Sequence, residues 1–232
     1  MSAEFRQFSG RGPLAKALAD AVMRRLQAAV DQRGIACLAV SGGSTPAMFF
    51  GLLSERPFAW DKVRITLVDE RWVPEDDARS NALMVKTLLL QNQAAAATFV
   101  PLHNAAATPE LGVRETKRMA GGIAENLDVA ILGMGTDGHT ASLFPAGDRL
   151  TEAVDPRCRA LFLAMNAPGL DTPRITMTAP VLLNARALFL HIEGTEKRAV
   201  LDKALQDGPV AEMPIRALIN HPEKSVSVFW AA

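Results

Sequence analysis

Short runs of consecutive apolar residues alternate along the chain with longer segments in which apolar residues recur every three or four positions. In the first long segment these apolar residues fall on one helical face, as Leu14, Leu18, Val22 and Leu26. This spacing predicts an amphipathic helix, with Pro13 at its first position and an end near Gly34. The run over residues 35–40 that follows has the length and composition of a buried strand.

The same alternation continues to the end of the chain. Further strands are predicted at residues 63–68, 98–102, 127–132, 160–164, 174–178, 187–191 and 226–230. Helical patterns lie between many of them, at residues 47–53, 80–91, 108–121 and 195–205. Strands that alternate with helices predict an α/β fold, a single doubly wound, mostly parallel sheet with helices on both faces in a modified Rossmann-like arrangement. Since the chain shows no repeat or linker, we expect one domain over residues 1–232.

The amino-acid composition limits the kinds of molecule that the protein is expected to bind. Lys and Arg together number 25, as do Asp and Glu, so the formal net charge is zero. No overall field attracts the protein to nucleic acid or to an anionic membrane, and we expect neither as a partner. No apolar run is long enough to span a bilayer, and residues 1–8 lack the apolar core of a signal peptide. Cys37 and Cys158 have no metal-ligand spacing and are expected to be free thiols. A soluble cytoplasmic protein is therefore expected.

A glycine-rich loop follows the first predicted strand and precedes a helix. Its residues are Ser41, Gly42, Gly43, Ser44 and Thr45, followed by Pro46. Backbone N–H groups at the start of a helix have no partner within the helix and favour a phosphate. Glycines allow close approach of the anion, and the hydroxyls add donors. A tight turn with a helix cap has the same pattern, but the position between strand and helix favours an anion site.

A second glycine-rich loop follows the strand at residues 127–132. Its six residues 133–138 match the spacing G-x-G-x-x-G, but only a short segment separates them from Pro145, so the long helix of a dinucleotide site is missing. Asp137 and His139 are the more informative residues. A histidine exchanges protons near neutral pH, and an aspartate two residues away can orient it. The alternative is a turn aspartate beside a solvated histidine.

Charged residues at other strand ends are candidates for binding an anionic substrate. Asp69 and Arg71 follow the second strand, Arg174 begins another, and Lys197 lies in the first turn of a helix. Arginine can pair with phosphate or carboxylate through two hydrogen bonds. Taken singly, a charged residue of this kind is more typical of the protein surface than of a binding site. His191 lies within a predicted strand and is expected to be a histidine with its hydrogen bonds satisfied at the edge of the core.

The sequence contains neither a G-x-S-x-G nucleophile motif nor a convincing metal-ligand spacing. We therefore expect no metal and no cofactor, and any hydrolysis should use an activated water molecule. An adventitious metal at His139 is a separate possibility that the sequence leaves open.

Taken in order, these motifs resemble the 6-phosphogluconolactonase family. The matching stretches are residues 38–46, 68–74, 80–81, 132–145, 174–178 and 194–197. The resemblance implies the deaminase/isomerase-like variant of the fold and hydrolysis of 6-phospho-D-glucono-1,5-lactone to 6-phospho-D-gluconate, a step of the pentose phosphate pathway. The related glucosamine-6-phosphate deaminases share several of these motifs but carry a Glu just before the proline that follows the His. Phe144 occupies that position here, which favours the lactonase.

By motif position, the resemblance implies a set of roles. Ser41, Gly42, Gly43, Ser44 and Thr45 would hold the 6-phosphate, with Lys197 and Arg174 neutralising it. His139 would act as general base or general acid, oriented by Asp137, and Arg71 or a backbone N–H would stabilise the oxyanion. Which of Asp69, Asp137 and His139 moves the proton stays open.

Two alternative functions are a deaminase or isomerase on the same fold and a non-catalytic sugar-phosphate-binding domain. The second would need an attached DNA-binding segment, and the residues before Gly12 are too few for one. The expected partner is a small phosphosugar lactone, bound by a monomer or a small homo-oligomer.

Overall fold

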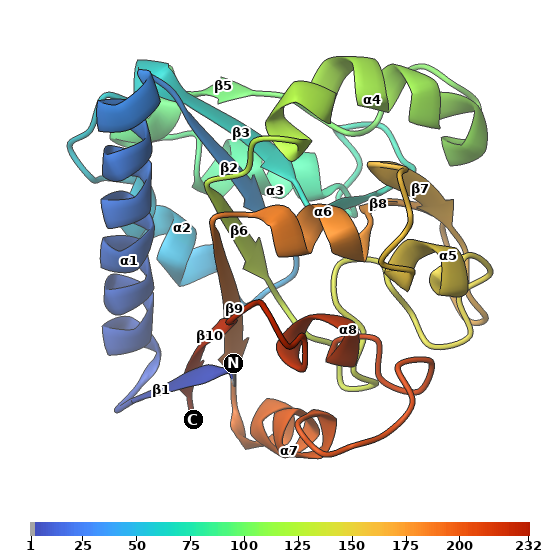
Figure 1. Ribbon diagram of the computed structural model, residues 1–232. Helices are drawn as coiled ribbons and strands as arrows, with labels where there is room; N and C mark the ends of the chain where they lie inside the picture. The colour runs from blue at the N-terminus through green and yellow to red at the C-terminus, as the bar shows by residue number, and fades with distance from the viewer. Residues whose placement is uncertain (1–2) are drawn as a thin grey trace.

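The computed structural model describes residues 3–232 and is organised around a seven-stranded sheet in which every neighbouring pair of strands is parallel (Figure 1). The strand order is β1-β10-β9-β6-β2-β3-β5. The strands are β1 (Glu4–Phe8), β2 (Ala36–Val40), β3 (Val63–Leu67), β5 (Thr98–Phe99), β6 (Val129–Leu132), β9 (Ala187–Glu193) and β10 (Ser227–Ala231). The mostly parallel α/β arrangement predicted from the alternating pattern is confirmed.

Helices cover both faces of this sheet. Helices α1 and α2 pack together on one side, and α4 and α6 lie on the other (Figure 1). The helices are α1 (Arg11–Arg33), α2 (Ala47–Ser54), α3 (Asn81–Leu88), α4 (Pro109–Ala124), α5 (Leu150–Val154), α6 (Ala179–Asn184), α7 (Thr195–Ala204) and α8 (Arg216–Ile219), with 3-10 turns at Trp60–Lys62 and Asn92–Ala96. The short helices α5, α6 and α8 were not predicted, because four to six residues are too few to establish a helical period.

Helix α1 follows its predicted pattern closely. The four apolar residues of its predicted face are completely buried. Gly34 ends the helix in the left-handed conformation, with φ of 74°, and its N–H donates to the carbonyl of Val30 at 2.8 Å. The helix begins at Arg11, so Pro13 is the third helical residue rather than the first. Both positions are compatible with proline, because the N–H groups of the first turn have no helical partner.

A second, antiparallel sheet of three strands departs from the prediction of a single sheet. It comprises β4 (Asp69–Arg71), β8 (Arg174–Met177) and β7 (Phe162–Met165), in that order. Val68 connects the two sheets, because its N–H donates to Val40 while its carbonyl accepts from Met177, at 3.0 and 2.8 Å. The chain thus leaves the parallel sheet after Leu67 and pairs with β8 instead. The local sequence pattern does not distinguish a strand of the parallel sheet from one of the antiparallel sheet, since β3 and β8 are both short and mostly buried.

Strand β1 was also missed. Its sequence is not a continuous apolar run, since only Phe5 and Phe8 are apolar, and all but the last of its side chains are exposed; the strand is defined by its parallel pairing with β10. The prediction about residues 1–8 falls partly on residues 1 and 2, which lie outside the described chain. Within residues 3–232, none of the helices has the length and apolar character required to cross a membrane.

Candidate active site

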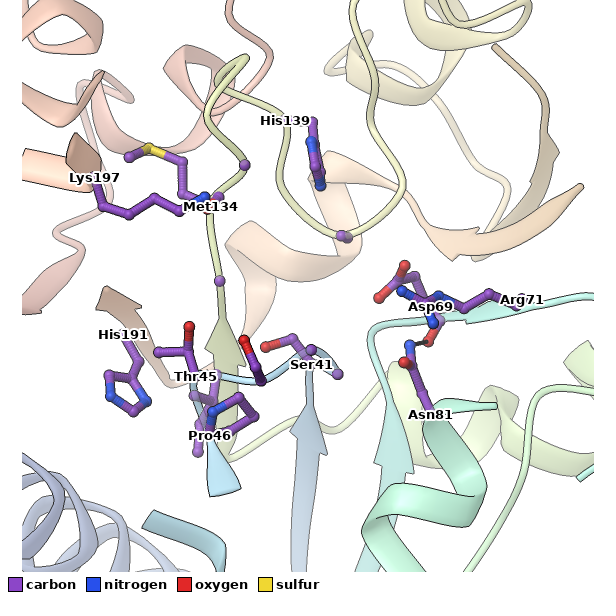
Figure 2. Close-up of a pocket in the computed structure, with 17 residues that line it drawn as sticks. Ser41, Thr45, Pro46, Asp69, Arg71, Asn81, Met134, His139, His191 and Lys197 are labelled. Carbon is purple, nitrogen blue, oxygen red and sulfur yellow. Dashed lines mark hydrogen bonds between the residues drawn. The ribbon is translucent and has the colours of Figure 1, made fainter. Parts of the chain in front are cut away.

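One pocket of about 260 Å³ lies where several strands of the parallel sheet end (Figure 2). Among the residues that line it are the following predicted site residues: Ser41, Gly42, Gly43, Ser44, Thr45, Asp69, Arg71, His139 and Lys197. The two glycine-rich loops therefore share one cavity. Asp137 and Arg174 are not part of the lining, but Asp137 contacts His139, and Arg174 pairs with Arg71 across β4 and β8. The parallel topology explains this convergence, because the carboxyl ends of parallel strands meet at one edge.

The loop after β2 presents backbone amides to the pocket. Ser41 is anchored by its N–H, which donates to the carbonyl of Ile131 on the neighbouring strand at 3.0 Å. Gly43 has φ of 91°, a conformation that favours glycine. Helix α2 begins directly after the loop, and no side chain caps its N-terminus. The first N–H groups of α2 therefore remain available for an anion.

Asn81 supports this loop from behind and also lines the pocket. A Cβ on Gly42 would lie 1.9 Å from Oδ1 of Asn81, so only glycine allows this close approach. The Nδ2 of Asn81 donates to the backbone carbonyl of Asp69 at 3.0 Å. Asn81 thus joins the loop after β2 to β4. In the sequence, Asn81 is part of the family pattern but carries no sign of this role.

Lys197 provides positive charge on the opposite side of the loop. Its Nζ donates to the carbonyl of Met134 at 2.6 Å, and Figure 2 shows the extended side chain lying beside Met134. Burial lowers the pKa of Lys197, while the nearby Glu196 and Asp137 carboxylates act in the opposite direction. An ammonium has three donors, so the group can bind an anion without giving up this anchor.

His139 and Asp137 form a close pair. The imidazole Nδ1 lies 2.6 Å from Oδ1 of Asp137, and the backbone N–H of His139 donates to the same oxygen at 3.1 Å. Burial raises the pKa of Asp137, but the hydrogen bonds from the His139 side chain and backbone outweigh it and lower the pKa to about 2. Asp137 is therefore ionised at neutral pH and accepts a hydrogen bond from the Nδ1–H of His139. This tautomer leaves Nε2 of His139 with a free lone pair.

Two neighbours fix the position of the imidazole. A Cβ on Gly135 would lie 2.1 Å from Nδ1 of His139 and 2.4 Å from Oδ1 of Asp137, so the pair packs directly on a residue without a side chain. The ring of Phe144 contacts the His139 ring with 4.5 Å between centroids. The imidazole extends from its loop toward the pocket, as Figure 2 shows.

The carboxylate of Asp69 is held by the segment that follows His139. Ser142 donates from Oγ to Oδ2 of Asp69 at 2.6 Å, and its N–H donates to Oγ1 of Thr176 at 3.2 Å. All three residues are buried. Ser142 therefore ties the loop that carries His139 to the small sheet that carries Asp69.

The neighbouring Glu70 has a structural role. It lies on the opposite face of β4 and is completely buried. Its carboxylate accepts hydrogen bonds from the N–H groups of Arg71, Asn81 and Ala82 and from the hydroxyl of Ser80, at 2.7 to 3.1 Å. Burial raises the pKa of Glu70, although the three backbone donors partly offset this. Glu70 fixes the start of α3 and with it the position of Asn81.

Arg71 and Arg174 lie directly opposite each other in the small sheet. Arg71 donates from Nη1 to the carbonyl of Arg79 at 2.5 Å. Arg174 is only 8% exposed, and its Nε has no hydrogen-bond partner among the described residues. Burial lowers the pKa of Arg174, and the charge of Arg71 lowers it further.

His191 is the second pocket residue that sequence analysis missed. It is buried at the end of β9, near Thr45 and Pro46 in Figure 2. Its Nε2 lies 3.2 Å from Oε1 of Glu193, whereas Nδ1 has no partner in the part of the chain that the structure describes. The expected satisfaction of its hydrogen bonds therefore holds for one nitrogen only. Burial lowers the pKa of His191 to about 4.

The residues of the pocket are suited to acid–base chemistry on an anionic substrate. Within residues 3–232, no group of three or more His, Cys, Asp or Glu side chains is arranged to hold a metal ion. The pocket instead combines exposed amides, an ammonium, two guanidinium groups nearby and an aspartate–histidine pair.

Comparison with known proteins shows which family the chain resembles over nearly its whole length. Residues 11–230 match the family described as glucosamine-6-phosphate isomerases/6-phosphogluconolactonase. The chain is 48% identical over 231 residues to a 6-phosphogluconolactonase of Rhizobium meliloti, with 100% of both chains covered. It is 47% identical to one of Mesorhizobium japonicum, over 97% of this chain and 93% of the relative. The crystal structure of a 6-phosphogluconolactonase from Shewanella baltica superposes with a TM-score of 0.96 at 41% identity, covering 99% of this chain and 98% of that one.

Proposed function

The chain belongs to the glucosamine-6-phosphate isomerase/6-phosphogluconolactonase family, and we propose that it hydrolyses 6-phospho-D-glucono-1,5-lactone to 6-phospho-D-gluconate. The observation that carries this proposal is the shared pocket, in which an amide-rich loop and His139 face the same cavity. The full-length similarity to proteins named 6-phosphogluconolactonase supports the same reaction. Phe144, at the position where the deaminases carry a Glu, argues against the deaminase alternative.

Binding of the phosphate is assigned to residues 41–45 and the N-terminus of α2, with Lys197 adding charge. This assignment is supported by the uncapped helix and by the ammonium that lines the same pocket. A phosphate fixed in this way would hold the lactone ring toward His139. Fixing two reacting groups in this manner can lower a barrier by up to about 7–11 kcal/mol in the most favourable cases.

His139 is proposed to transfer the proton in both halves of the reaction. In the first half, Nε2 accepts a proton from water while the water oxygen bonds to C1 and the carbonyl becomes an oxyanion. In the second half, the oxyanion collapses, the bond from C1 to the ring oxygen breaks, and the imidazolium returns the proton to that oxygen. The ionised Asp137 stabilises the imidazolium between these steps. The carboxylic acid that forms then ionises in water.

The test is hydrolysis of freshly prepared 6-phosphogluconolactone at controlled pH, with the spontaneous rate subtracted. Relative to wild type, His139→Ala should lower kcat by about 100-fold or more with a smaller change in KM, which is the scale of general acid–base catalysis. A variant with nearly wild-type kcat would remove His139 from the chemistry. Release of ammonia from glucosamine 6-phosphate by the wild type would instead support the deaminase.

Lys197→Met separates phosphate binding from the chemistry. It should raise KM for the phosphorylated lactone and leave kcat/KM for unphosphorylated glucono-1,5-lactone nearly unchanged. Equal losses on the two substrates would contradict the assignment of Lys197 to the phosphate.

A further inference from the structure

Arg174 has an unusual environment for an arginine. It is more than nine-tenths buried, yet its Nε has no hydrogen-bond partner among the described residues. Its closest carboxylate oxygen belongs to Asp171, at 3.9 Å, and Asp171 is itself 66% exposed on its side chain. The guanidinium carbon lies 6.0 Å from the centre of the Phe144 ring. Arginine is almost never buried without a partner, because its charge and its donors both lose water.

The small sheet places a second positive charge beside it. Arg71 and Arg174 are directly opposite residues of antiparallel strands, so their side chains project from the same face of the sheet. Asp69 and Thr176 form the next pair on that face, where Ser142 contacts both. Arg71 and Asp69 line the pocket. Arg174 is therefore directed to the same side as the pocket.

The surrounding carboxylates neutralise this pair of arginines only in part, because Asp171 lies 3.9 Å from Arg174 and is largely exposed. Glu70 is on the other face of β4 and is used by four donors at the start of α3. Asp69 is engaged by Ser142. Like charges directly opposite each other destabilise a sheet. Two adjacent arginines with unused donors match the two oxygens of a carboxylate, which guanidinium groups bind with parallel hydrogen bonds.

We propose that Arg174, together with Arg71, forms a subsite for the oxygens on C1 of the substrate, separate from the phosphate site. This inference rests on the proposed function, because it takes the phosphate to be held at residues 41–45. Carbon 1 carries no net charge in the lactone but carries a negative oxygen in the tetrahedral intermediate and a carboxylate in the product. The pair thus binds the intermediate and the product more strongly than the substrate.

Two ligands of equal length test this subsite. 6-Phosphogluconate and D-glucitol 6-phosphate carry the same phosphate and carbon chain but differ at C1, which is a carboxylate in one and a hydroxymethyl group in the other. Affinity is measured by calorimetry for wild type and for Arg174→Met, which retains an apolar stem near Phe144. Loss of a charge-assisted pair should weaken 6-phosphogluconate about 10- to 100-fold. Binding of glucitol 6-phosphate should change less than about threefold.

Lys197→Met is the matched control, since it should weaken both ligands by the same factor. Equal weakening of both ligands by Arg174→Met would place Arg174 at the phosphate and overturn the inference, as would unchanged affinity for both. If Arg174→Met fails to fold, Arg174→Lys decides by the same criteria, because it keeps the charge but loses the planar fork. If the wild type hydrolyses the lactone but Arg174→Met loses the same affinity for both ligands, the C1 subsite is overturned and the proposed function is not. A wild type that neither hydrolyses the lactone nor distinguishes the two ligands would overturn the proposed function as well.

Discussion

Gly135→Ala offers a direct test of the aspartate–histidine pair without removing either member. The added methyl group would lie 2.1 Å from Nδ1 of His139 and 2.4 Å from Oδ1 of Asp137. These are the two atoms of the 2.6 Å hydrogen bond between the side chains. These separations are far inside van der Waals contact, so at least one of the two side chains must move. The hydrogen bond that selects the tautomer of His139 is then lost or misdirected.

The size of the effect follows from the role given to the pair. General acid–base catalysis contributes roughly 10²–10⁴ to a rate. We expect Gly135→Ala to lower kcat for the phosphorylated lactone by about 100-fold or more, equivalent to about 3 kcal/mol of barrier. The loop proposed to bind the phosphate is a separate segment, so KM should change much less than kcat. The measurement is the rate of lactone hydrolysis after subtraction of the spontaneous reaction, with thermal unfolding recorded for each variant.

Gly133→Ala is the control within the same loop. A Cβ at Gly133 would meet only the hydroxyl oxygen of Ser41, at an ordinary contact distance of 3.7 Å. A cost below about 1 kcal/mol is typical of such a contact, so kcat should fall by less than about fivefold. If Gly135→Ala retained a kcat within fivefold of wild type, the close pairing of Asp137 and His139 would not matter for turnover, and the reasoning would fail.

Two further predictions concern stability. Burial keeps folded His191 neutral down to about pH 4, whereas the unfolded residue protonates near pH 6.5, so the folded state binds fewer protons between these values. Lowering the pH from 7 to 5 should therefore cost about 2 kcal/mol of unfolding free energy through His191. His191→Gln should remove that part of the pH dependence in urea unfolding, because the variant keeps Glu193 and its ion pair with Arg11 and loses only the imidazole. An identical pH dependence of the unfolding free energy in the variant and the wild type would contradict this. Glu70→Gln replaces a carboxylate that accepts four hydrogen bonds with an amide, whose NH₂ group would face donors instead of acceptors. It should lower the unfolding free energy at neutral pH by about 1–3 kcal/mol, and an unchanged urea midpoint would refute the capping role.

The parallel sheet could be predicted because its strands are buried on both faces. Strands such as β2 and β6 are uninterrupted apolar runs that end at polar, glycine-rich loops. That pattern predicts both where the strand lies in the sequence and at which edge of the sheet the following loop is placed. Strand β1 lacks the pattern because its side chains are exposed, and only contact with β10 at the far end of the chain defines it.

The site was predictable to the same extent. The residues of the two loops could be placed together because parallel strands end at one edge. Asn81 and Ser142 could not, because their roles are contacts with Gly42 and Asp69, which are distant in the sequence. His191 was misjudged for a related reason, since burial was inferred correctly from its strand but the missing partner of Nδ1 is visible only in three dimensions.

Phe144 connects the fold to the choice of reaction. Its ring contacts His139 at 4.5 Å and lies 6.0 Å from the guanidinium carbon of Arg174, so one apolar residue separates the proposed proton carrier from the proposed C1 subsite. A glutamate at this position, as in the related deaminases, would place a carboxylate beside both groups. It would neutralise Arg174 and compete with Asp137 for the imidazole, providing an acid for ring opening and weakening the binding of a negative C1 oxygen. With phenylalanine there, the ion pair of Arg174 among the described residues is the 3.9 Å contact with the largely exposed Asp171, and His139 has Asp137 as its carboxylate partner within hydrogen-bonding distance. Phenylalanine at this position therefore leaves the proposed C1 subsite positively charged, which suits the proposed hydrolysis of a lactone.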